Sequence, residues 1–338
     1  MASPESGTGP PSEGATVAIG VDIGGTATRF VAADHTTGDI LARLTVSTPH
    51  TGGPDAILAF FRAHIGQVAR HARPAAVGIG ASGPIDPGGV IRNPATLPAF
   101  TGVPLTDLVA TLVPGPVVLE NDAVCAALAE HRVGAAQRSR RSLHVTLGTG
   151  VGVCLLDGDT PFRLGDGTHP EAGHLAVAVP TAQCYCGRRA CWEQAASRQN
   201  LQRTAAGLLG RSPSDSTAIA DLAARDDSIA NTAFRDYGGR IAEGLATLLA
   251  LYGPDLVVLG GSAASYLPLY RASIADRLAP LGGWLPSYDL TGTQLDDYGG
   301  AIGGAGLAID ALRLSPAGPA VLPAAAARTR HRARGTSP

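Results

Sequence analysis

The chain has 338 residues, of which 45% are hydrophobic and 4% aromatic, and its formal net charge is −2; this length is enough for about two domains with large cores. Its body carries no basic stripe and no apolar run of membrane length, so we expect no nucleic-acid partner, no membrane location and a place in the cytoplasm. All 26 basic residues are arginine, which excludes P-loop enzymes, protein kinases and Schiff-base enzymes, because each of these needs a lysine.

Residues 1–16 have no apolar segment and are expected to form a flexible tail, and a hairpin follows. The stretch AIGVDIGGTATRFVAAD, residues 18–34, is an apolar strand, a turn and a second apolar strand. Gly24 and Gly25, together with Thr26, would let backbone N–H groups approach phosphate oxygens, and Asp22 could hold the water shell of Mg²⁺. Taken alone, an ordinary structural turn explains this pattern equally well.

A strand-to-helix junction follows in PGPVVLENDAVCAALAEHRVGAA, residues 114–136. Its polar residues Glu120, Asn121 and Asp122 stand between a strand and an amphipathic helix. A carboxylate there can be a helix N-cap. It can also be a general base that accepts a proton from a hydroxyl during phosphoryl transfer.

A second glycine hairpin occurs in SLHVTLGTGVGVCLLDG, residues 142–158. Its turn, Gly148, Thr149 and Gly150, repeats the plan of the first hairpin. Two such hairpins predict two related halves that face one nucleotide.

The stretch HPEAGHLAVAVPTAQCYCGRRACWEQ, residues 169–194, concentrates three of the five cysteines. An odd number of closely spaced thiols is a poor disulfide framework. Cys184, Cys186 and Cys191 with His174 instead match a tetrahedral structural zinc site, and reduced cysteines that bind nothing are the alternative.

Two further glycine-rich elements follow. In PDLVVLGGSAAS, residues 254–265, a buried strand ends at Gly260 and Gly261 before a helical stretch, a place suited to a nucleoside. The stretch DDYGGAIGGAGLAIDAL, residues 296–312, opens the last helix with small residues that allow close packing. Residues 315–338, with four arginines, are expected to be a flexible tail.

In this order, six motifs resemble those of the ROK family, which groups repressors with bacterial sugar kinases. They are DIGGTATR, ENDAVCAALAE, LGTGVGV, EAGH followed by CYCGRRACWEQAAS, VVLGGSAA and DDYGGAIGGAGLA. The resemblance implies an α/β protein of the actin-like ATPase (ribonuclease H-like) fold, with two mixed α/β domains around a nucleotide and sugar cleft. We expect the first domain at 17–121 plus 301–314 and the second at 122–300, with a zinc loop at 169–194.

The same resemblance assigns roles to residues. Asp122 is implied as the catalytic base, Asp22 as the magnesium-associated carboxylate, and the two glycine turns, with Gly260 and Gly261, as the ATP site. The implied sugar contacts are Asn121, Glu171, His174 and Glu193. His174 would also ligate structural zinc, so that the metal orients the substrate wall and is not the catalyst.

Several positions depart from the family pattern, most of them on the acceptor side. Thr96 stands where many members have a sugar-contacting asparagine, and Ser82 replaces a proline. Val153 and Cys154 replace glycines after the second turn, where Val153 would narrow the site. Ala190 stands where glycine is usual. The acceptor is therefore less well defined than the reaction.

We expect ATP-dependent phosphorylation of the primary (6-) hydroxyl of a hexose. Glucose is the default acceptor, and the alternatives are an amino sugar of the kanosamine type or a C7 cyclitol. A catalytically silent sugar-binding relative and a sugar-sensing regulator are the other hypotheses; family repressors carry an N-terminal helix-turn-helix, whereas about sixteen residues precede the first strand here. The resemblance further implies a homodimer or homotetramer.

Overall fold

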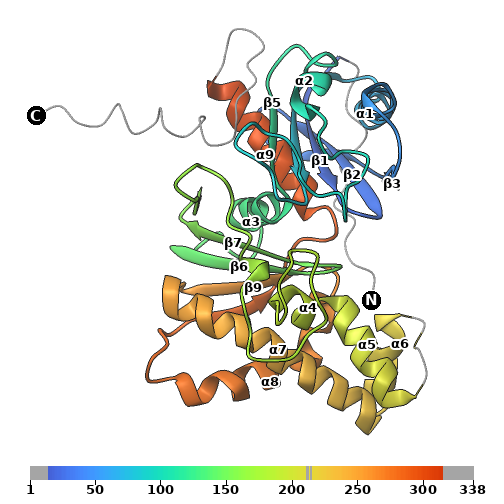
Figure 1. The fold of residues 1–338 in the computed structure, drawn as a ribbon. Helices are drawn as coiled ribbons and strands as arrows, with labels where there is room; N and C mark the ends of the chain where they lie inside the picture. Colours follow the sequence, from blue (N-terminus) through green and yellow to red (C-terminus); the bar gives the residue numbers. More distant parts are fainter. Residues whose placement is uncertain (1–13, 211–212, 214, 315–338) are drawn as a thin grey trace, which may run out of the picture. The chain divides into compact units, whose positions relative to one another are not determined.

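The computed structural model describes residues 14–210, 213 and 215–314, and these residues form two compact units. The first unit takes the chain up to Ala129, the segment Arg163–His169 and the chain from Tyr298 onward; the second takes Glu130–Phe162 and Pro170–Asp297. Each unit contains one β-sheet with helices packed on it (Figure 1). The tail expected at 315–338 lies outside the described residues, as does the tail expected at 1–16 except for residues 14–16, where the first strand begins at Thr16.

The first unit has a five-stranded sheet with the order β3-β2-β1-β4-β5. Its strands are β1 (Thr16–Ile23), β2 (Ala27–Asp34), β3 (Ile40–Ser47), β4 (Arg73–Ala81) and β5 (Val117–Asn121). The first three pair antiparallel, while β4 is parallel to β1 and β5 is parallel to β4. Successive residues of β1 enter different cores, Val17 and Ile19 in one and Ala18 in the other. Burial of both faces explains why β1 is almost continuously apolar.

The second unit has a five-stranded sheet with the order β10-β9-β6-β7-β8. Its strands are β6 (Arg141–Leu147), β7 (Val151–Asp157), β8 (Thr160–Pro161), β9 (Leu256–Gly260) and β10 (Asp289–Gly292). Here β6, β7 and β8 pair antiparallel, β9 is parallel to β6, and β10 is parallel to β9. Both sheets therefore have the same connectivity, an antiparallel meander of three strands followed by two parallel crossovers. This repeat agrees with the expectation of two related halves.

The helices differ more between the units than the strands do. The first unit contains α1 (Pro54–Ala69), α2 (Leu105–Ala110), the start of α3 (Asp122–Val133) and α9 (Gly299–Leu314). The second contains α4 (Trp192–Ala196), α5 (Arg198–Leu209), α6 (Ser216–Ala223), α7 (Ser228–Tyr252), α8 (Leu267–Leu278) and the short 3₁₀ turns η1 (Ala172–His174), η2 (Ala264–Tyr266) and η3 (Ala279–Leu281). Most of these extra helices lie between β8 and β9, where the first unit has only α1 between β3 and β4.

The last helix, α9, lies against β1 and β4 with glycine at its points of closest approach (Figure 1). A Cβ atom on Gly20 of β1 would lie 1.9 Å from the carbonyl oxygen of Ala301, and one on Gly78 of β4 would lie 1.9 Å from that of Gly304. A side chain at either position would push the helix off the sheet. The small residues of 296–312 thus pack closely, as the sequence predicted.

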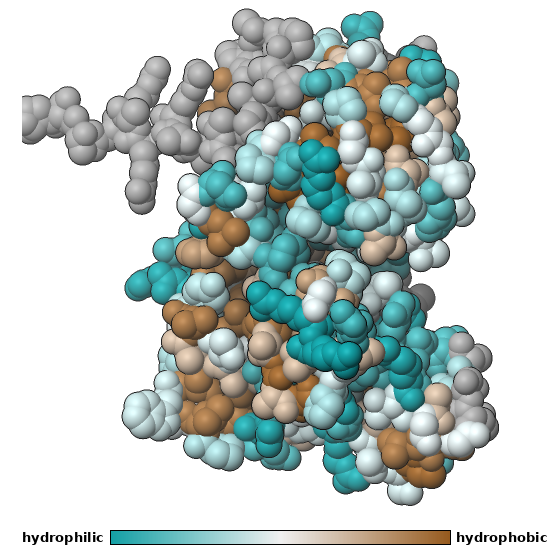
Figure 2. All heavy atoms as spheres, in the orientation of Figure 1, coloured by the Kyte–Doolittle hydropathy of each residue, from teal (hydrophilic) through white to brown (hydrophobic). Residues whose placement is uncertain are grey.

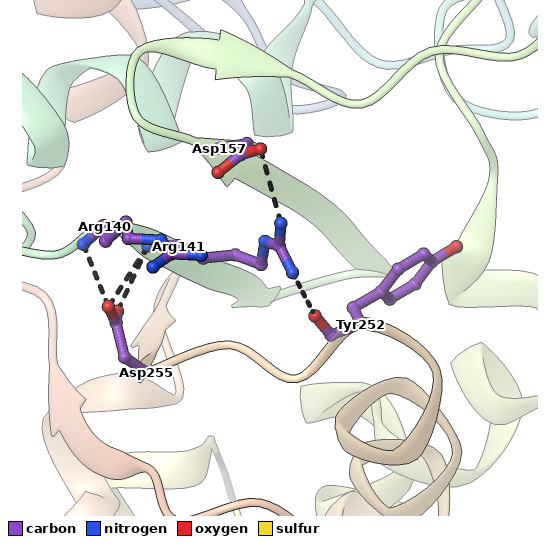
Figure 3. A network of polar contacts seen from close by, with 5 residues as sticks. All are labelled: Arg140, Arg141, Asp157, Tyr252 and Asp255. Atoms are coloured by element: carbon purple, nitrogen blue, oxygen red, sulfur yellow. Dashed lines mark hydrogen bonds and ion pairs between the residues drawn. The ribbon is translucent and has the colours of Figure 1, made fainter.

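A polar network fixes the start of β6 beside the start of β9 (Figure 3). The carboxylate of Asp255 accepts hydrogen bonds from the backbone N–H groups of Arg140, at 3.0 Å, and Arg141, at 3.2 Å. The Arg141 guanidinium donates to the carbonyl of Tyr252 at 3.1 Å and pairs with Asp157 at 3.4 Å. These contacts join the ends of β6, β7 and α7 and set the register that places the second glycine turn at the far end of β6.

The surface carries few features that suggest a membrane or an extended apolar partner. On the face drawn in Figure 2, hydrophobic areas are interrupted by hydrophilic residues. Trp284 is the most exposed large apolar side chain of the described residues, at 89%. In the part of the chain that the structure describes, no helix combines the length and apolarity needed to cross a membrane.

Candidate functional site

The first glycine turn, between β1 and β2, is braced by a threonine on the neighbouring strand end. Gly24 donates its N–H to the carbonyl of Ala27 at 3.1 Å, which closes the turn. The Thr48 hydroxyl donates to the Gly24 carbonyl at 2.6 Å, and the Thr48 N–H donates to the Thr26 carbonyl at 3.0 Å. These bonds do not use the N–H groups of Gly25 and Thr26, so these two amides are the ones suited to meet a phosphate oxygen.

Asp22, near the end of β1, lies against the first turn of α9. A Cβ atom on Gly300 would come within 2.7 Å of the carboxyl carbon of Asp22, so only glycine fits there. A carboxylate beside a helix N-terminus is stabilised in its charged form by the helix dipole. A charged, half-buried carboxylate next to a glycine turn is suited to hold a hydrated Mg²⁺.

Thr96 lies beside the first turn, and a buried asparagine holds it there. Its methyl carbon is 3.0 Å from the place a Cβ atom on Gly25 would take. The Thr96 N–H donates to Asn93 at 3.1 Å, and the Asn93 amide donates to the carbonyl of Gly83 at 2.7 Å. Sequence reasoning did not single out Asn93, which is 1% exposed. The available signal was a lone amide side chain in a loop rich in proline.

The junction of β5 and α3 resolves which residue caps the helix. The Asn121 side-chain oxygen accepts the Ala123 N–H at 2.9 Å, which is N-cap geometry, and one Asp122 oxygen accepts the same N–H at 2.8 Å. Because Asn121 can serve as the cap, Asp122 is not needed for that role. Burial raises the pKa of the Asp122 carboxyl, and its bonds to Ala123 oppose that shift in part. A carboxyl with a raised pKa is a stronger base once ionised.

Glu120, directly before the junction, is held by an arginine that sequence reasoning missed. Arg163 donates to one Glu120 oxygen at 3.0 Å and pairs with the other, so the contact is bidentate. The Glu120 side chain is 4% exposed and that of Arg163 is 21% exposed. Glu120 also accepts the backbone N–H of Asn121 at 2.8 Å. The ion pair therefore fixes the backbone that carries Asn121 and Asp122.

In the first unit the strand register brings the predicted residues to one edge of the sheet. Ile23 of β1 pairs with Ala81 of β4, and Ala81 pairs with Asn121 of β5. Adjacent strands lie about 4.8 Å apart, so the end of β1 and the end of β5 are separated by only about 10 Å. The first glycine turn, Asp22, Thr96 and the pair Asn121 and Asp122 are thus neighbours within this unit.

The second glycine turn, between β6 and β7, is closed by its own backbone and held by a carboxylate. Gly148 donates its N–H to the carbonyl of Gly150 at 3.0 Å. A Cβ atom on Gly150 would lie 2.4 Å from an oxygen of Glu193, and the same oxygen accepts the Val151 N–H at 3.4 Å. Glu193, predicted as a sugar contact, is therefore also the residue against which this turn rests. Thr149 is exposed at the tip of the turn.

The third glycine element lies against the second turn, as a nucleotide site requires. Gly261 has φ +76, and a Cβ atom there would lie 2.7 Å from the backbone nitrogen of Leu147. Ala263, two residues on, donates its N–H to the Leu147 carbonyl at 2.9 Å. The end of β9, at Gly260, and the end of β6 are thus joined, since Gly260 also pairs with Thr146.

Val153 and Cys154 sit differently from the expectation that Val153 narrows the site. Val153 is 5% exposed and belongs to the hydrophobic core of the second unit. Cys154 is 1% exposed. These departures from glycine therefore fill the interior beneath the turn.

Four predicted metal ligands converge in the second unit. The ligand atoms of His174, Cys184, Cys186 and Cys191 all lie within 4.8 Å of one another. The Nδ1 atom of His174 is 3.3 Å from the Cys191 sulfur and 3.6 Å from the Cys184 sulfur. Three thiols and one imidazole at these spacings are a donor set that fits zinc.

The thiols of this cluster are costly to ionise without a cation. Burial raises the pKa of Cys191 to about 12 and also raises that of Cys184. A bound divalent cation would reverse this preference, because it stabilises thiolates directly.

The loop that presents the cysteines makes two left-handed bends. Gly187 has φ +86 and closes a turn in which its N–H donates to the Cys184 carbonyl at 2.9 Å. Ala190, where the family pattern has glycine, has φ +56. An alanine in this region is strained by about 1 kcal/mol or more.

The other nitrogen of His174 meets a tyrosine of the same loop. The Nε2 atom of His174 lies 3.1 Å from the hydroxyl of Tyr185, and the two rings are perpendicular, with centroids 5.1 Å apart. The charges of Glu193 and Glu171 add to burial in raising the pKa of Tyr185. The predicted sugar contacts Glu171, His174 and Glu193 thus gather around Tyr185, which sequence reasoning did not assign.

Trp192 anchors the metal loop to the core. It is fully buried, and a Cβ atom on Gly244 of α7 would lie 2.1 Å from its ring. Its indole N–H donates to the carbonyl of Arg240 at 3.0 Å. Because Trp192 stands between Cys191 and Glu193, this anchor fixes a metal ligand and a predicted sugar contact together.

Comparison with known proteins identifies relatives over most of the chain. The model of the ROK family matches residues 18–311. The glucokinase of Streptomyces coelicolor is 31% identical over 314 residues, covering 86% of this chain and 96% of that protein. The crystal structure of a ROK family glucokinase from Streptomyces griseus in complex with glucose and AMPPNP has a TM-score of 0.75 and 32% identity, covering 86% of this chain and 99% of that one.

The similarity extends to regulators. The xylose repressor of Bacillus spizizenii is 28% identical over 200 residues, which cover 58% of this chain and 51% of the repressor. The actin-like ATPase fold predicted from the motifs is confirmed: two mixed α/β sheets with helices superpose on the Streptomyces griseus structure.

Proposed function

Because the chain belongs to the ROK family, we propose that it transfers the terminal phosphate of ATP to the primary hydroxyl of a hexose or a close analogue. It is an ATP-dependent sugar kinase by the relatives it matches, glucokinases at about 30% identity over most of its length. The observation that carries the proposal is Asp122. It is a carboxyl with a raised pKa beside the first glycine turn, at the common edge of β1 and β5.

The residues of the first unit support a direct transfer. Asp122 would accept the proton of the sugar hydroxyl as its oxygen attacks the γ-phosphorus and ADP departs. The Glu120–Arg163 pair holds the backbone of Asn121, which leaves the Asn121 amide nitrogen to contact ring hydroxyls. Asp22 would hold Mg²⁺, which when bound neutralises phosphate charge, and the N–H groups of Gly25 and Thr26 would contact phosphate oxygens.

The residues of the second unit support binding of both substrates. His174, Cys184, Cys186 and Cys191 would hold zinc, whose role is to fix the loop. Glu171, His174 and Glu193 would then contact the sugar. Thr149, with the N–H groups around Gly148 and Gly150, would contact the phosphates of ATP. Gly260 and Gly261 would receive the nucleoside.

Glucose is the default acceptor within this proposal, with an amino sugar of the kanosamine type or a C7 cyclitol as alternatives. Thr96 is the residue on which this choice depends most. It is shorter than an asparagine and lies beside Gly25, so it leaves room and removes one amide donor on the acceptor side. A site that lacks a hydrogen-bond donor discriminates hydroxyl patterns differently by orders of magnitude.

The test is an assay of ADP release with Mg-ATP against glucose, mannose, N-acetylated hexosamines, 3-amino-3-deoxyglucose and C7 cyclitols. Strong turnover on glucose would assign an ordinary glucokinase. Turnover on one analogue alone would make Thr96 a specificity determinant, which Thr96→Asn should shift toward glucose. No turnover on any acceptor, with sugar binding retained, would favour a silent sugar-binding or regulatory relative.

The proposal also includes a cytoplasmic homodimer or homotetramer. Light scattering on the purified chain, with and without acceptor, measures the assembly directly.

A further inference from the structure

A kinase without lysine needs another cation for the phosphates of its nucleotide. The sequence contains 26 basic residues and all are arginine. Backbone N–H groups and a metal ion supply part of the required positive potential. A guanidinium adds up to five N–H donors in a planar fork that matches phosphate oxygens. The second glycine turn has one arginine bound directly to its backbone.

Arg198 is the first residue of α5, and its backbone is attached to that turn. Its N–H donates to the carbonyl of Gly148 at 2.9 Å. Ser197 caps the helix, because its hydroxyl accepts the N–H of Asn200 at 3.4 Å. The start of α5, where the helix dipole favours an anion, therefore lies against the second glycine turn.

The side chain of Arg198 is partly buried without a protein partner. Its Nε atom is buried and makes no hydrogen bond to any of the described residues. No carboxylate of the described chain pairs with it, whereas Arg163, Arg240 and Arg277 each pair with one. Buried polar atoms in native proteins are nearly always satisfied, and an orphaned one points to a ligand or a bound water.

A second orphaned atom lies in the same place. The hydroxyl of Tyr237, on α7, is buried without a hydrogen-bond partner among the described residues, and the residue is 1% exposed. The charge of Arg198 is close enough to oppose the rise that burial causes in the pKa of Tyr237. Arg198 and Tyr237 are therefore neighbours, each with unused hydrogen-bonding capacity.

The surroundings connect this pair to both glycine elements of the second unit. The Tyr237 ring lies edge-on to Tyr270, with centroids 5.2 Å apart. The Tyr270 hydroxyl donates to the carbonyl of Ala263 at 3.0 Å, and Ala263 donates its N–H to Leu147. Arg198 thus stands between the turn at Gly148 and the element that follows Gly260.

We propose that the guanidinium of Arg198 binds the phosphates of the nucleotide and takes the place that a lysine fills in other nucleotide-binding sites. This inference rests on the proposed use of ATP and assigns a residue to that site. It requires no new chemistry at Asp122, since Arg198 acts on the nucleotide alone.

The experiment measures the binding of ADP and of adenosine to the full chain by calorimetry, without acceptor. Arg198→Gln should weaken ADP binding by about tenfold to a hundredfold, the usual loss for a hydrogen bond to a charged group. Adenosine binding should change by less than about threefold, because adenosine carries no phosphate. Arg203→Gln, on the same helix but exposed, is the matched control and should change neither.

Unchanged ADP affinity, or an equal loss for ADP and adenosine, would overturn the assignment. If Arg198→Gln does not fold, Arg198→Lys keeps the charge and is measured in its place, with a smaller loss for ADP and again none for adenosine. The kinase proposal is tested separately by turnover of the unaltered chain. A chain that binds ADP through Arg198 but phosphorylates no acceptor would refute the kinase proposal and leave this one standing.

Discussion

The two glycine turns occupy the same place in two sheets of identical connectivity, yet different neighbours hold them. The turn at Gly24 is braced by Thr48. The turn at Gly148 rests on the carboxylate of Glu193 and on the backbone of Arg198, both of which follow the cysteine loop. One turn is therefore supported by the common framework of the sheet, and the other by an insertion.

The strand ends diverge in the same sense. The fifth strand of the first unit ends at Asn121, directly before Asp122, while the corresponding β10 ends at Gly292. The first unit thus carries the proton acceptor and the second carries the metal ligands. The repeated fold supplied two equivalent edges, and chemistry was added to each by a different route.

The largest effect is expected at the strand end that the second unit lacks. Asp122→Asn should lower kcat by about 10²- to 10⁴-fold, because it removes a positioned general base. Acceptor affinity should stay within a few-fold, since the hydroxyl contacts come from other residues. Turnover and acceptor binding measure the two quantities, with the exposed Asp107→Asn as control. A variant with wild-type kcat would refute the base assignment.

The same substitution has a pH signature. Burial raises the folded-state pKa of Asp122 above 3.8, so the carboxyl costs stability as it ionises with rising pH. Asparagine cannot ionise. Denaturant unfolding should therefore find Asp122→Asn more stable than the wild type at pH 7, and the difference should shrink as the pH falls toward 3.8. Activity of the wild type should rise with pH through the raised pKa.

The next effect compares a buried ion pair of the first unit with an exposed pair of the second. Arg163→Met should cost about 3 kcal/mol or more of unfolding free energy, because it leaves the buried carboxylate of Glu120 unpaired. Arg277→Met, whose guanidinium is 61% exposed beside Glu243, should cost under about 1 kcal/mol. Equal losses in denaturant unfolding would contradict the role given to burial, and Glu120→Gln added to Arg163→Met should recover part of the loss.

Removal of a metal ligand tests whether the second turn depends on the insertion. Cys184→Ser should release zinc and raise the acceptor KM by about tenfold. The ATP KM should rise too, but less, because Glu193 contacts both the cluster and the second turn. Metal content and both KM values decide this, with Cys154→Ala, outside the cluster, as control. Equal rises would indicate a general folding role for the loop.

The smallest effect concerns backbone strain in the insertion. Ala190→Gly should stabilise the protein by about 1 kcal/mol, because φ +56 suits glycine. Ala182→Gly, in the same loop without a positive φ, should give no gain. Denaturant midpoints of the metal-loaded proteins provide the comparison. A loss of stability in Ala190→Gly would show that the bend is not strained.

The sequence alone predicted features whose signal is local. Glycine turns, a Cys-X-Cys loop and apolar strands are written in consecutive residues, so the fold, the family and the convergence of four metal-ligand candidates were all predicted correctly. The pair of Glu120 with Arg163 spans 43 positions, and that of Glu193 with Val151 spans 42. No periodicity marks such contacts. Val153 was misjudged for the same reason, because the side of a strand that faces the core depends on what packs against it.

The position of α9 has a consequence for how the protein is made. This helix completes the core of the first unit against Ala18 and Ala76, but it is the last helix of the described chain to be synthesised. The sheet face that begins at residue 16 therefore stays uncovered on the ribosome until about residue 314 has emerged, while the helices of the second unit have all their partners earlier. A nascent chain that stalls before Gly299 would expose a flat, alanine-lined sheet, which makes the final sixteen-residue helix the step that commits the first unit to its native state.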